Sequence, residues 1–155
     1  MKWLAVDYGD SRTGLAGCDE SETVTSPITP QIEEKSMNKV AAAVVEAVRA
    51  RSAAGLVCGL PKNMDGTEGK RAEKSRRFAQ RLANMAGMPV VMWDERRTTV
   101  SAAAILADND TFGQKRKDKL DSVSAAVILE SFLNWRAHHP DETAPEQLLP
   151  QPQEQ

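Results

Sequence analysis

The apolar run Trp3–Val6 ends in Asp7, and two glycines, Gly9 and Gly14, follow closely. This pattern predicts a strand, a tight polar turn and a second strand, because glycine permits backbone torsions that other residues avoid. Asp7 would lie at the mouth of this hairpin and Arg12 in its loop. An aspartate in that position is either a turn former that accepts hydrogen bonds from nearby backbone N–H groups or a functional carboxylate. The rest of the chain has to decide between the two.

The elements after the hairpin follow the spacing of apolar residues. They are expected as a strand at Glu22–Ile28, a helix at Ser36–Arg51, a strand at Leu56–Pro61, a helix carrying Phe78, Leu82 and Met85 on its buried side, a strand at Met88–Trp93, a helix from Thr98 or Thr99 through Leu106, a basic loop at Asp108–Lys119 and a last helix from Leu120 to about Trp135. A meander followed by alternating helices and strands predicts an α/β fold: one five-stranded mixed sheet flanked by helices. We expect the strand order 3-2-1-4-5, with strand 2 antiparallel.

Polar side chains follow each of the strands predicted to be parallel, and this coincidence is the first evidence for a site. Asp7 ends strand 1, Asn63 and Asp65 follow strand 4, and Asp94 and Glu95 follow strand 5. Ligands of open α/β sheets gather beyond the carboxyl ends of the parallel strands. These side chains should therefore lie close together.

Several carboxylates brought together repel one another unless a cation is bound between them. Mg²⁺ and similar ions take carboxylates, waters and substrate phosphates as ligands, so a divalent metal site is expected. The candidates are Asp7, Asp94 or Glu95, and Asp118 or Asp121. The alternatives are structural: Asp118 and Asp121 suit the N-cap and third position of the last helix. Asp94-Glu95-Arg96 equally suits a solvated strand end with an ion pair.

Lys70, Lys74 and Arg77 recur on one face of the second helix, and the loop before Asp118 is also basic. Such a stripe is either a solvated helix face or a surface that holds a polyanion against the carboxylates. The net charge of −2 excludes a uniformly basic protein but allows a local basic face.

Other chemistries and compartments have less support in the chain. The two histidines, His138 and His139, adjoin a Pro-, Gln- and Glu-rich tail, which argues against a histidine base or a zinc site. Cys18 and Cys58 lie in apolar runs and are expected to be free thiols, typical of a cytoplasmic protein. No apolar stretch is long enough for a membrane helix. We expect one domain at residues 1–137 and a disordered tail at 138–155.

Four ordered motifs resemble the YqgF (RuvX) family, a bacterial branch of the RNase H-like fold related to Holliday junction resolvases. They are Asp7-Tyr8-Gly9 with Arg12 and Gly14, Gly59-Leu60-Pro61 with Asn63, Asp65 and Gly66, Asp94-Glu95-Arg96 with Thr98-Thr99, and Asp121 with Ala125-Ala126. The resemblance covers about residues 1–136. It implies an RNase H-like sheet and a Mg²⁺- or Mn²⁺-dependent nuclease whose acidic residues are Asp7, Glu95 and Asp121.

The resemblance further implies that Arg12, Asn63, Asp65, Arg96 and Thr98 orient the carboxylates or the substrate phosphate. The expected function is hydrolysis of phosphodiester bonds in 5′-end processing of pre-16S ribosomal RNA, as part of ribosome biogenesis. One alternative is a Holliday junction resolvase acting on branched DNA, which would need a dimer. Another is a nucleic-acid-binding or regulatory module without turnover. We expect a monomer or weak homodimer.

Overall fold

The computed structural model describes residues 1–98 and 114–152, and for residues 114–121 it describes the backbone only. Its elements in chain order are β1 (Trp3–Asp7), β2 (Thr13–Cys18), β3 (Thr25–Ile32), α1 (Met37–Arg51), β4 (Gly55–Leu60), α2 (Lys70–Ala86), β5 (Val90–Asp94), the short 3₁₀ helix η1 (Glu95–Arg97), α4 (Gln114–His138) and β6 (Gln147–Leu148). The helix predicted from Thr98 or Thr99 through Leu106 falls almost entirely on residues 99–113, which lie outside the described part.

The strands form one mixed sheet in the order β3-β2-β1-β4-β5-β6. β1, β4 and β5 are parallel, and β2 runs antiparallel to β1. The predicted order 3-2-1-4-5 is therefore confirmed, and β6 extends the sheet beyond the five expected strands. β3 lies at the opposite edge, where Pro27 and Pro30 can be accommodated without a second strand beyond them.

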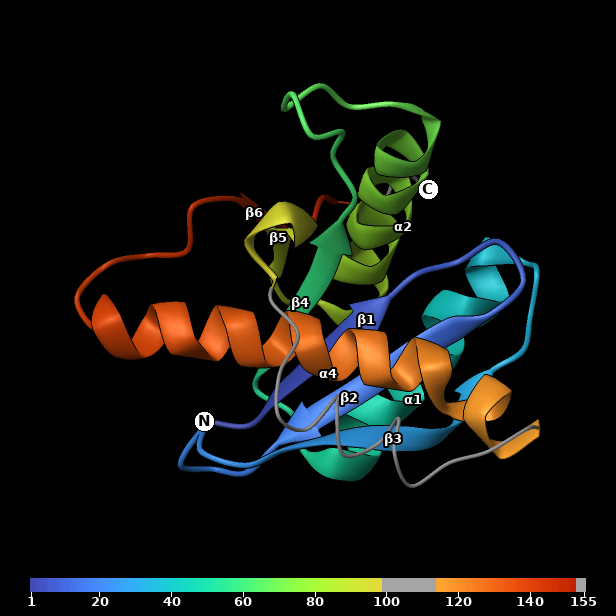
Figure 1. Cartoon of the computed structure of the whole chain (residues 1–155), viewed down its shortest axis with the longest axis horizontal. Coiled ribbons are helices and arrows are strands. Elements are labelled where there is room, and N and C mark those ends of the chain that lie inside the picture. Colours follow the sequence, from blue (N-terminus) through green and yellow to red (C-terminus); the bar gives the residue numbers. More distant parts are fainter. Residues whose placement is uncertain (99–113, 153–155) are drawn as a thin grey trace.

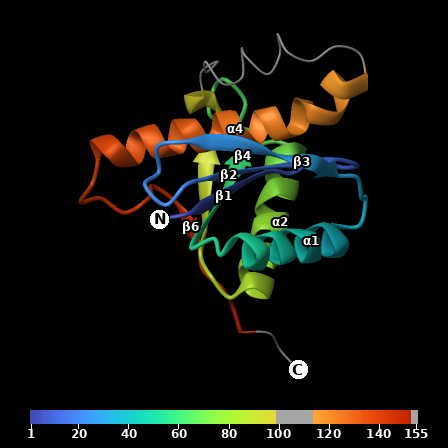
Figure 2. The same cartoon turned by 90° about the horizontal axis from the view of Figure 1, so that it is seen from below.

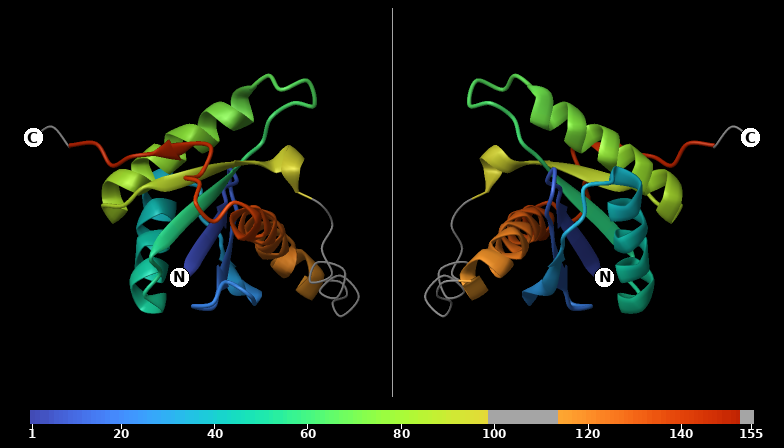
Figure 3. Two further views of the ribbon diagram at one scale, coloured as in Figure 1. Left: turned by 90° about the vertical axis from the view of Figure 1, so that its left-hand side faces the viewer. Right: turned by 90° about the vertical axis from the view of Figure 1, so that its right-hand side faces the viewer.

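Helices cover both faces of the sheet. α1 and α2 pack on one face and α4 crosses the other, as Figures 1, 2 and 3 show from three directions. Alternate residues of each strand supply the two cores. Leu4, Val6, Leu56 and Cys58 pack under α1 and α2, whereas Trp3, Ala5, Val57, Val91 and Trp93 pack under α4. Because successive side chains of a strand point to opposite faces, this alternation also gives the face on which the last residue of each strand lies.

The last helix begins earlier than expected. α4 starts at Gln114, so residues 114–119 are helical and the predicted loop ends sooner. Asp118 and Asp121 consequently lie within the helix and not at its N-cap and third position, which corrects that alternative. Gly113 is the last strong helix breaker before a run of Lys, Arg and Gln, which are good helix formers.

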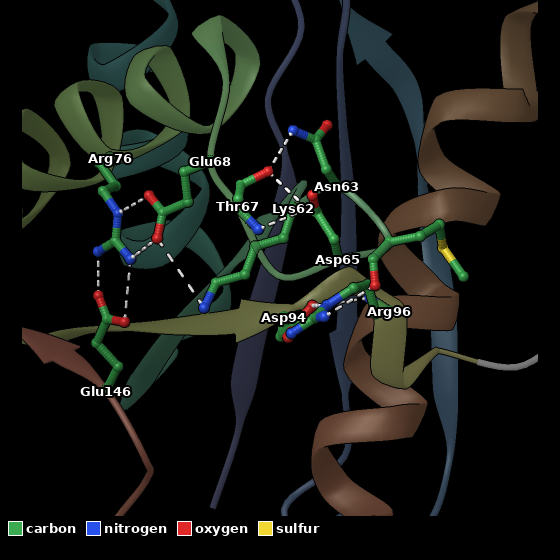
Figure 4. A network of polar contacts seen from close by, with 10 residues as sticks. Lys62, Asn63, Asp65, Thr67, Glu68, Arg76, Asp94, Arg96 and Glu146 are labelled. Carbon is green, nitrogen blue, oxygen red and sulfur yellow. Dashed lines mark hydrogen bonds and ion pairs between the residues drawn. The ribbon is translucent and has the colours of Figure 1, made fainter.

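The segment after α4 does not behave as the disordered tail that its composition predicted. β6 pairs antiparallel with the edge of β5, and Leu148 packs against the core beneath it. Arg76 of α2 forms ion pairs with Glu146 and Glu68, drawn in Figure 4. Farther along, Gln80 donates to the Leu149 carbonyl (2.8 Å) and Asn84 accepts from the Gln151 N–H (2.8 Å). The free edge of β5 and one face of α2 together supply the partners that a polar segment needs to be ordered.

One ion pair connects the β2–β3 turn to α4, and it gives a stability prediction. Glu22 accepts hydrogen bonds from Arg136 (2.8 and 3.2 Å), which lowers the pKa of the Glu22 carboxyl. The folded state therefore favours the ionised form, and the resulting stability is present above the ordinary pKa of 4.5 and lost as the pH falls below it. Glu22→Gln should lower the free energy of unfolding by about 1 kcal/mol at neutral pH.

Urea denaturation of the wild type and Glu22→Gln at pH 7 and at pH 3 measures this effect. The difference between the two proteins should shrink at the lower pH. Glu20→Gln is the matched control. Glu20 is exposed, and the substitution removes the same charge two residues away from Glu22. An equal loss of stability in both variants, or a pH-independent difference, would contradict the prediction.

Candidate active site

Asp7 is the last residue of β1, at the carboxyl end of the central strand. It has the same strand parity as Trp3 and Ala5, so its side chain is on the α4 face of the sheet. Opposite it in β2 is Gly14, which has no side chain to fill this position. Burial, and then the charge of Asp7, raise the pKa of the Cys58 thiol in the neighbouring strand β4. The parallel register, in which Val6 pairs with Cys58, likewise places Asp7 at the end of β4.

Glu95 comes from η1, immediately after β5, and its side chain lies over Gly59 of β4. A Cβ placed on Gly59 would lie 3.1 Å from Glu95 Cδ and 2.6 Å from Ile128 Cδ1 of α4. In the parallel register Val6 pairs with Cys58, so Asp7 and Gly59 are the next residues along, side by side. Because Gly59 has no side chain, the Glu95 carboxyl can occupy the space above it on the α4 face, next to Asp7. The structure thus brings together two of the three predicted acidic residues.

Glu95 is partly desolvated in this position. Burial raises the pKa of its carboxyl, the positive charge of Arg71 lowers it, and the charge of Asp94 raises it further. A carboxylate held ionised in such surroundings gains from a nearby cation. Thr98 donates through Oγ1 to the Glu95 carbonyl (2.6 Å), which closes the turn that carries Glu95. Thr98 therefore positions the backbone of this residue.

Asp94 is engaged by Arg96. The guanidinium of Arg96 donates to both Asp94 carboxylate oxygens (2.7–3.1 Å), and the Asp94 side chain also accepts from the Arg96 N–H (2.9 Å). These bonds lower the pKa of the Asp94 carboxyl. Figure 4 shows the pair beneath the loop after β4, where Arg96 also donates to the Met64 carbonyl (3.4 Å). Of the two adjacent acids, Asp94 is held by this ion pair and Glu95 is directed to the α4 face.

Asn63 and Asp65 shape that loop. The Asn63 amide donates to Thr67 Oγ1 (2.9 Å), and Asp65 accepts from both the N–H (3.0 Å) and the hydroxyl (2.6 Å) of Thr67. Gly66 has φ of +90°, and a Cβ there would lie 3.4 Å from the Arg96 guanidinium. These side chains are exposed, and in the described structure their contacts hold the loop's shape next to Arg96. Their predicted role in substrate binding stays a prediction.

The basic residues at the start of α2 lie beside the end of β1. Lys74 pairs with Asp10 (3.1 Å) and Arg77 with Glu73 (3.2 Å), and all four side chains are exposed, so these pairs are weak. A pocket of about 250 Å³ is lined by residues from the β1–β2 loop and α2, namely Tyr8, Gly9, Asp10, Arg71, Lys74 and Ser75. Lys70, the first residue of α2, is exposed at the same end of the helix.

Arg71 was missed by the sequence analysis. It is exposed, lines this pocket and acts electrostatically on Glu95, so it connects the basic helix to the carboxylates. It lies outside the Lys70–Lys74–Arg77 stripe, and nothing in its spacing distinguishes it from a solvated arginine. Arg12 is exposed in the β1–β2 loop, whose tight path is set by Gly9: a Cβ there would overlap the Arg12 carbonyl.

The donor set fits a hard divalent cation. Asp7 and Glu95 present carboxylate oxygens on one face, one of them desolvated, which is the ligand type that Mg²⁺ and Mn²⁺ take. Within residues 1–98 and 122–152, no three His, Cys, Asp or Glu side chains form a group able to hold a metal ion. Asp118 and Asp121 are outside that set, because only their backbone in α4 is described. Their part in a metal site remains a prediction.

Comparisons with known proteins show what this chain is similar to. The family model described as RuvX, Holliday junction resolvase, matches residues 1–135. Two curated relatives carry the name "Putative pre-16S rRNA nuclease": one from Paracoccus denitrificans, 39% identical over 129 residues (83% of this chain, 81% of the relative), and one from Symbiobacterium thermophilum, 37% identical over 143 residues (92% and 99%). Thermus thermophilus RuvC in complex with a Holliday junction substrate has a similar fold, with a TM-score of 0.53 and 10% identity over 87% of this chain and 96% of that one.

Proposed function

Because this chain belongs to the RuvX family, we propose that it is a metal-dependent nuclease that processes the 5′ end of pre-16S ribosomal RNA. The observation that carries the proposal is the convergence of Asp7 and Glu95 through the gap at Gly59. Carboxylates gathered at the ends of separate strands, beside a basic helix end, match the needs of phosphodiester hydrolysis. The choice of RNA as the substrate follows the names of the curated relatives.

Each part of the site has a distinct task in this proposal. Asp7, Glu95 and Asp121 would hold Mg²⁺ or Mn²⁺, with Asp118 as a further candidate. Asp121 is seven residues, two helical turns, before Ile128, the α4 residue that adjoins Gly59 and Glu95. When bound there, the metal would supply an activated water and stabilise the leaving oxygen.

Binding and orientation of the substrate fall to the surrounding cations. Arg71, Lys70, Lys74 and Arg77 would hold the phosphates next to the carboxylates, and Arg12 would meet the strand from the β1–β2 loop. Arg96, fixed by Asp94, would orient the loop that carries Asn63 and Asp65. Thr98 keeps Glu95 in place.

Branched DNA is the second candidate substrate, favoured by the family description and by the RuvC-like fold. A resolvase makes two symmetric cuts and needs a dimer, whereas processing of one RNA end does not.

Among the described helices, none is long and apolar enough to cross a membrane. A cytoplasmic location and a monomer or weak homodimer remain proposals.

Cleavage by the pure protein tests the proposal. We expect a 5′-extended 16S precursor RNA to be shortened in Mg²⁺ or Mn²⁺ and left intact with a chelator, and a four-way DNA junction to be cut far more slowly. Preferential cutting of the junction would favour the resolvase. No metal-dependent cleavage of either substrate would favour the non-catalytic module.

Gly59→Ala tests whether the space left by the missing side chain of Gly59 positions the Glu95 carboxyl. The new methyl group displaces Ile128 Cδ1 and presses on the Glu95 carboxyl, so the free energy of unfolding should fall by about 1 kcal/mol. The cleavage rate should fall about tenfold, because small displacements of a catalytic group are costly. Denaturation and single-turnover cleavage measure the two effects.

Ile128→Val in the Gly59→Ala background is the matched rescue, because it removes the Cδ1 atom that clashes. The double variant should regain stability but not cleavage rate, since Glu95 stays displaced. Ile128→Val alone serves as the control. Unchanged cleavage by Gly59→Ala would mean that the Glu95 position over Gly59 is unimportant.

A further inference from the structure

A second pocket, of about 360 Å³, lies between the end of β5 and the last turns of α4. Its lining combines two indole rings with polar and basic side chains: Trp93, Arg97, Ser131, Asn134, Trp135, His138 and His139. Its side chains have no part in the proposed chemistry. We call it the aromatic pocket.

The walls of the aromatic pocket are held in place by specific contacts. Ser131 Oγ accepts from Trp93 Nε1 (3.0 Å) and donates to the Arg97 carbonyl (3.0 Å), joining α4 to β5 and η1. The His139 ring stacks on Trp135, with centroids 4.8 Å apart and planes 15° apart, and its Nδ1 donates to the Trp135 carbonyl (2.8 Å). The Arg97 guanidinium lies 4.7 Å from the Trp93 ring centroid. The pocket is therefore preformed.

The composition of the aromatic pocket differs from that of an ordinary core cluster. Trp93 is 2% exposed and belongs to the core, but Trp135 and His139 are partly exposed and Arg97 and Asn134 are exposed. Among the described residues that line the pocket, none is a carboxylate. Aromatic rings beside an arginine, an amide and a hydroxyl are the groups that bind unpaired bases, by stacking and by hydrogen bonds to base edges.

The position of the aromatic pocket connects it to the carboxylates. Arg97 follows Glu95 by two residues in the same 3₁₀ turn. On α4, Ile128 adjoins Glu95, and Trp135 is seven residues farther on, about 10 Å along the helix axis. A strand bound at Asp7 and Glu95 would reach this distance within about three nucleotides, taking about 3.4 Å per nucleotide.

We propose that the aromatic pocket binds an unpaired nucleobase of the substrate strand, a few nucleotides from the bond that is cut, by stacking it on the outside of the Trp135–His139 ring pair. The pocket would hold single-stranded RNA in register over the carboxylates and disfavour a fully paired duplex at that point. This inference rests on the proposed function for the identity of the strand. A protein partner is the other occupant that such a surface could take.

Binding to a cleavage-deficient protein separates these possibilities. In the Asp7→Asn background, a short single-stranded RNA is compared with an abasic ribose-phosphate strand of the same length and charge. The RNA should bind about tenfold more tightly and quench tryptophan fluorescence, whereas the abasic strand should not quench. Trp135 is the responding fluorophore, because Trp3 and Trp93 are 7% and 2% exposed.

Variants at Trp135 show whether the ring itself stacks. Trp135→Leu should lose about tenfold in RNA affinity and the preference over the abasic strand. Trp135→Phe should keep the affinity while the quenching disappears. His139→Ala, which leaves the tryptophan in place, should weaken RNA binding several-fold even if Trp135→Leu does not fold.

Equal affinity for RNA and the abasic strand would overturn the inference, as would unchanged RNA affinity in both Trp135→Leu and His139→Ala. Base-independent binding would leave a protein partner as the occupant of the pocket. Failure of this inference can be told apart from failure of the proposed function. If wild-type protein cuts no RNA but binds bases through Trp135, the nuclease assignment fails and the pocket stands.

Discussion

Asp7→Asn is expected to lower the rate of RNA cleavage by about three orders of magnitude, which corresponds to about 4 kcal/mol in the barrier. Asp7 ends the central strand, faces α4 and lies beside Gly59, where the Glu95 carboxyl converges with it. The amide has nearly the same shape but loses the negative charge that a divalent cation requires. RNA affinity should stay the same or rise, because one repulsion of the phosphate backbone is removed.

Single-turnover cleavage and equilibrium binding of the same precursor RNA measure the two quantities separately. Glu46→Gln on α1 removes an equal charge at an exposed position away from the site, and it should change neither. Loss of RNA binding together with cleavage would indicate that Asp7 supports the fold or the binding surface. Full metal-dependent cleavage by Asp7→Asn would remove Asp7 from the catalytic set.

Glu95→Gln is expected to lower cleavage by about 100- to 1,000-fold without destabilising the protein. Burial raises the pKa of Glu95, so ionisation of this carboxyl is less favourable in the folded chain than in the unfolded one. Its charge therefore lowers stability once the pH is above its ordinary pKa of 4.5, and the neutral amide removes that cost. The melting temperature of Glu95→Gln in a chelator at pH 7 should equal or exceed that of the wild type.

Divalent metal provides the second measurement for this variant. Mg²⁺ or Mn²⁺ should raise the melting temperature of the wild type, because a ligand that binds the folded state stabilises it, and should do so less for Glu95→Gln. Asp94→Asn is the informative comparison. It should lose stability, because Arg96 loses its carboxylate partner, and it should respond to metal as the wild type does. A large stability loss in Glu95→Gln would point to a structural role.

Much of the sheet followed from local pattern. The apolar runs Trp3–Val6 and Leu56–Leu60 and the amphipathic spacing of Ser36–Arg51 predicted β1, β4 and α1 with their order in the sheet. Ser36 caps α1 by accepting from the Lys39 N–H. These elements bury continuous or periodic apolar surface, so the signal lies within a few neighbouring residues.

The errors arose where distant contacts decide the conformation. Residues 146–151 are too polar to bury a core of their own, yet they are ordered by Arg76, Gln80, Asn84 and the free edge of β5. The start of α4 was placed too late because residues 114–119 carry no apolar periodicity, although helix propensity favours them. Composition alone does not report such partners.

The sequence by itself determined the order of the strands, and with it the meeting of Asp7 and the Asp94–Glu95 pair at one end of the sheet, because parallel strands align their carboxyl ends. The pattern of residues left open which of the two adjacent acids faces Asp7, the family resemblance implied Glu95, and the tertiary structure supplies the physical reason. Arg96 holds Asp94, and the absent side chain of Gly59 lets Glu95 reach the α4 face. The tertiary structure also placed Arg71 near Glu95, and Trp135 and His139 in the pocket beside Arg97. Packing between distant elements, which no local pattern encodes, fixed those positions.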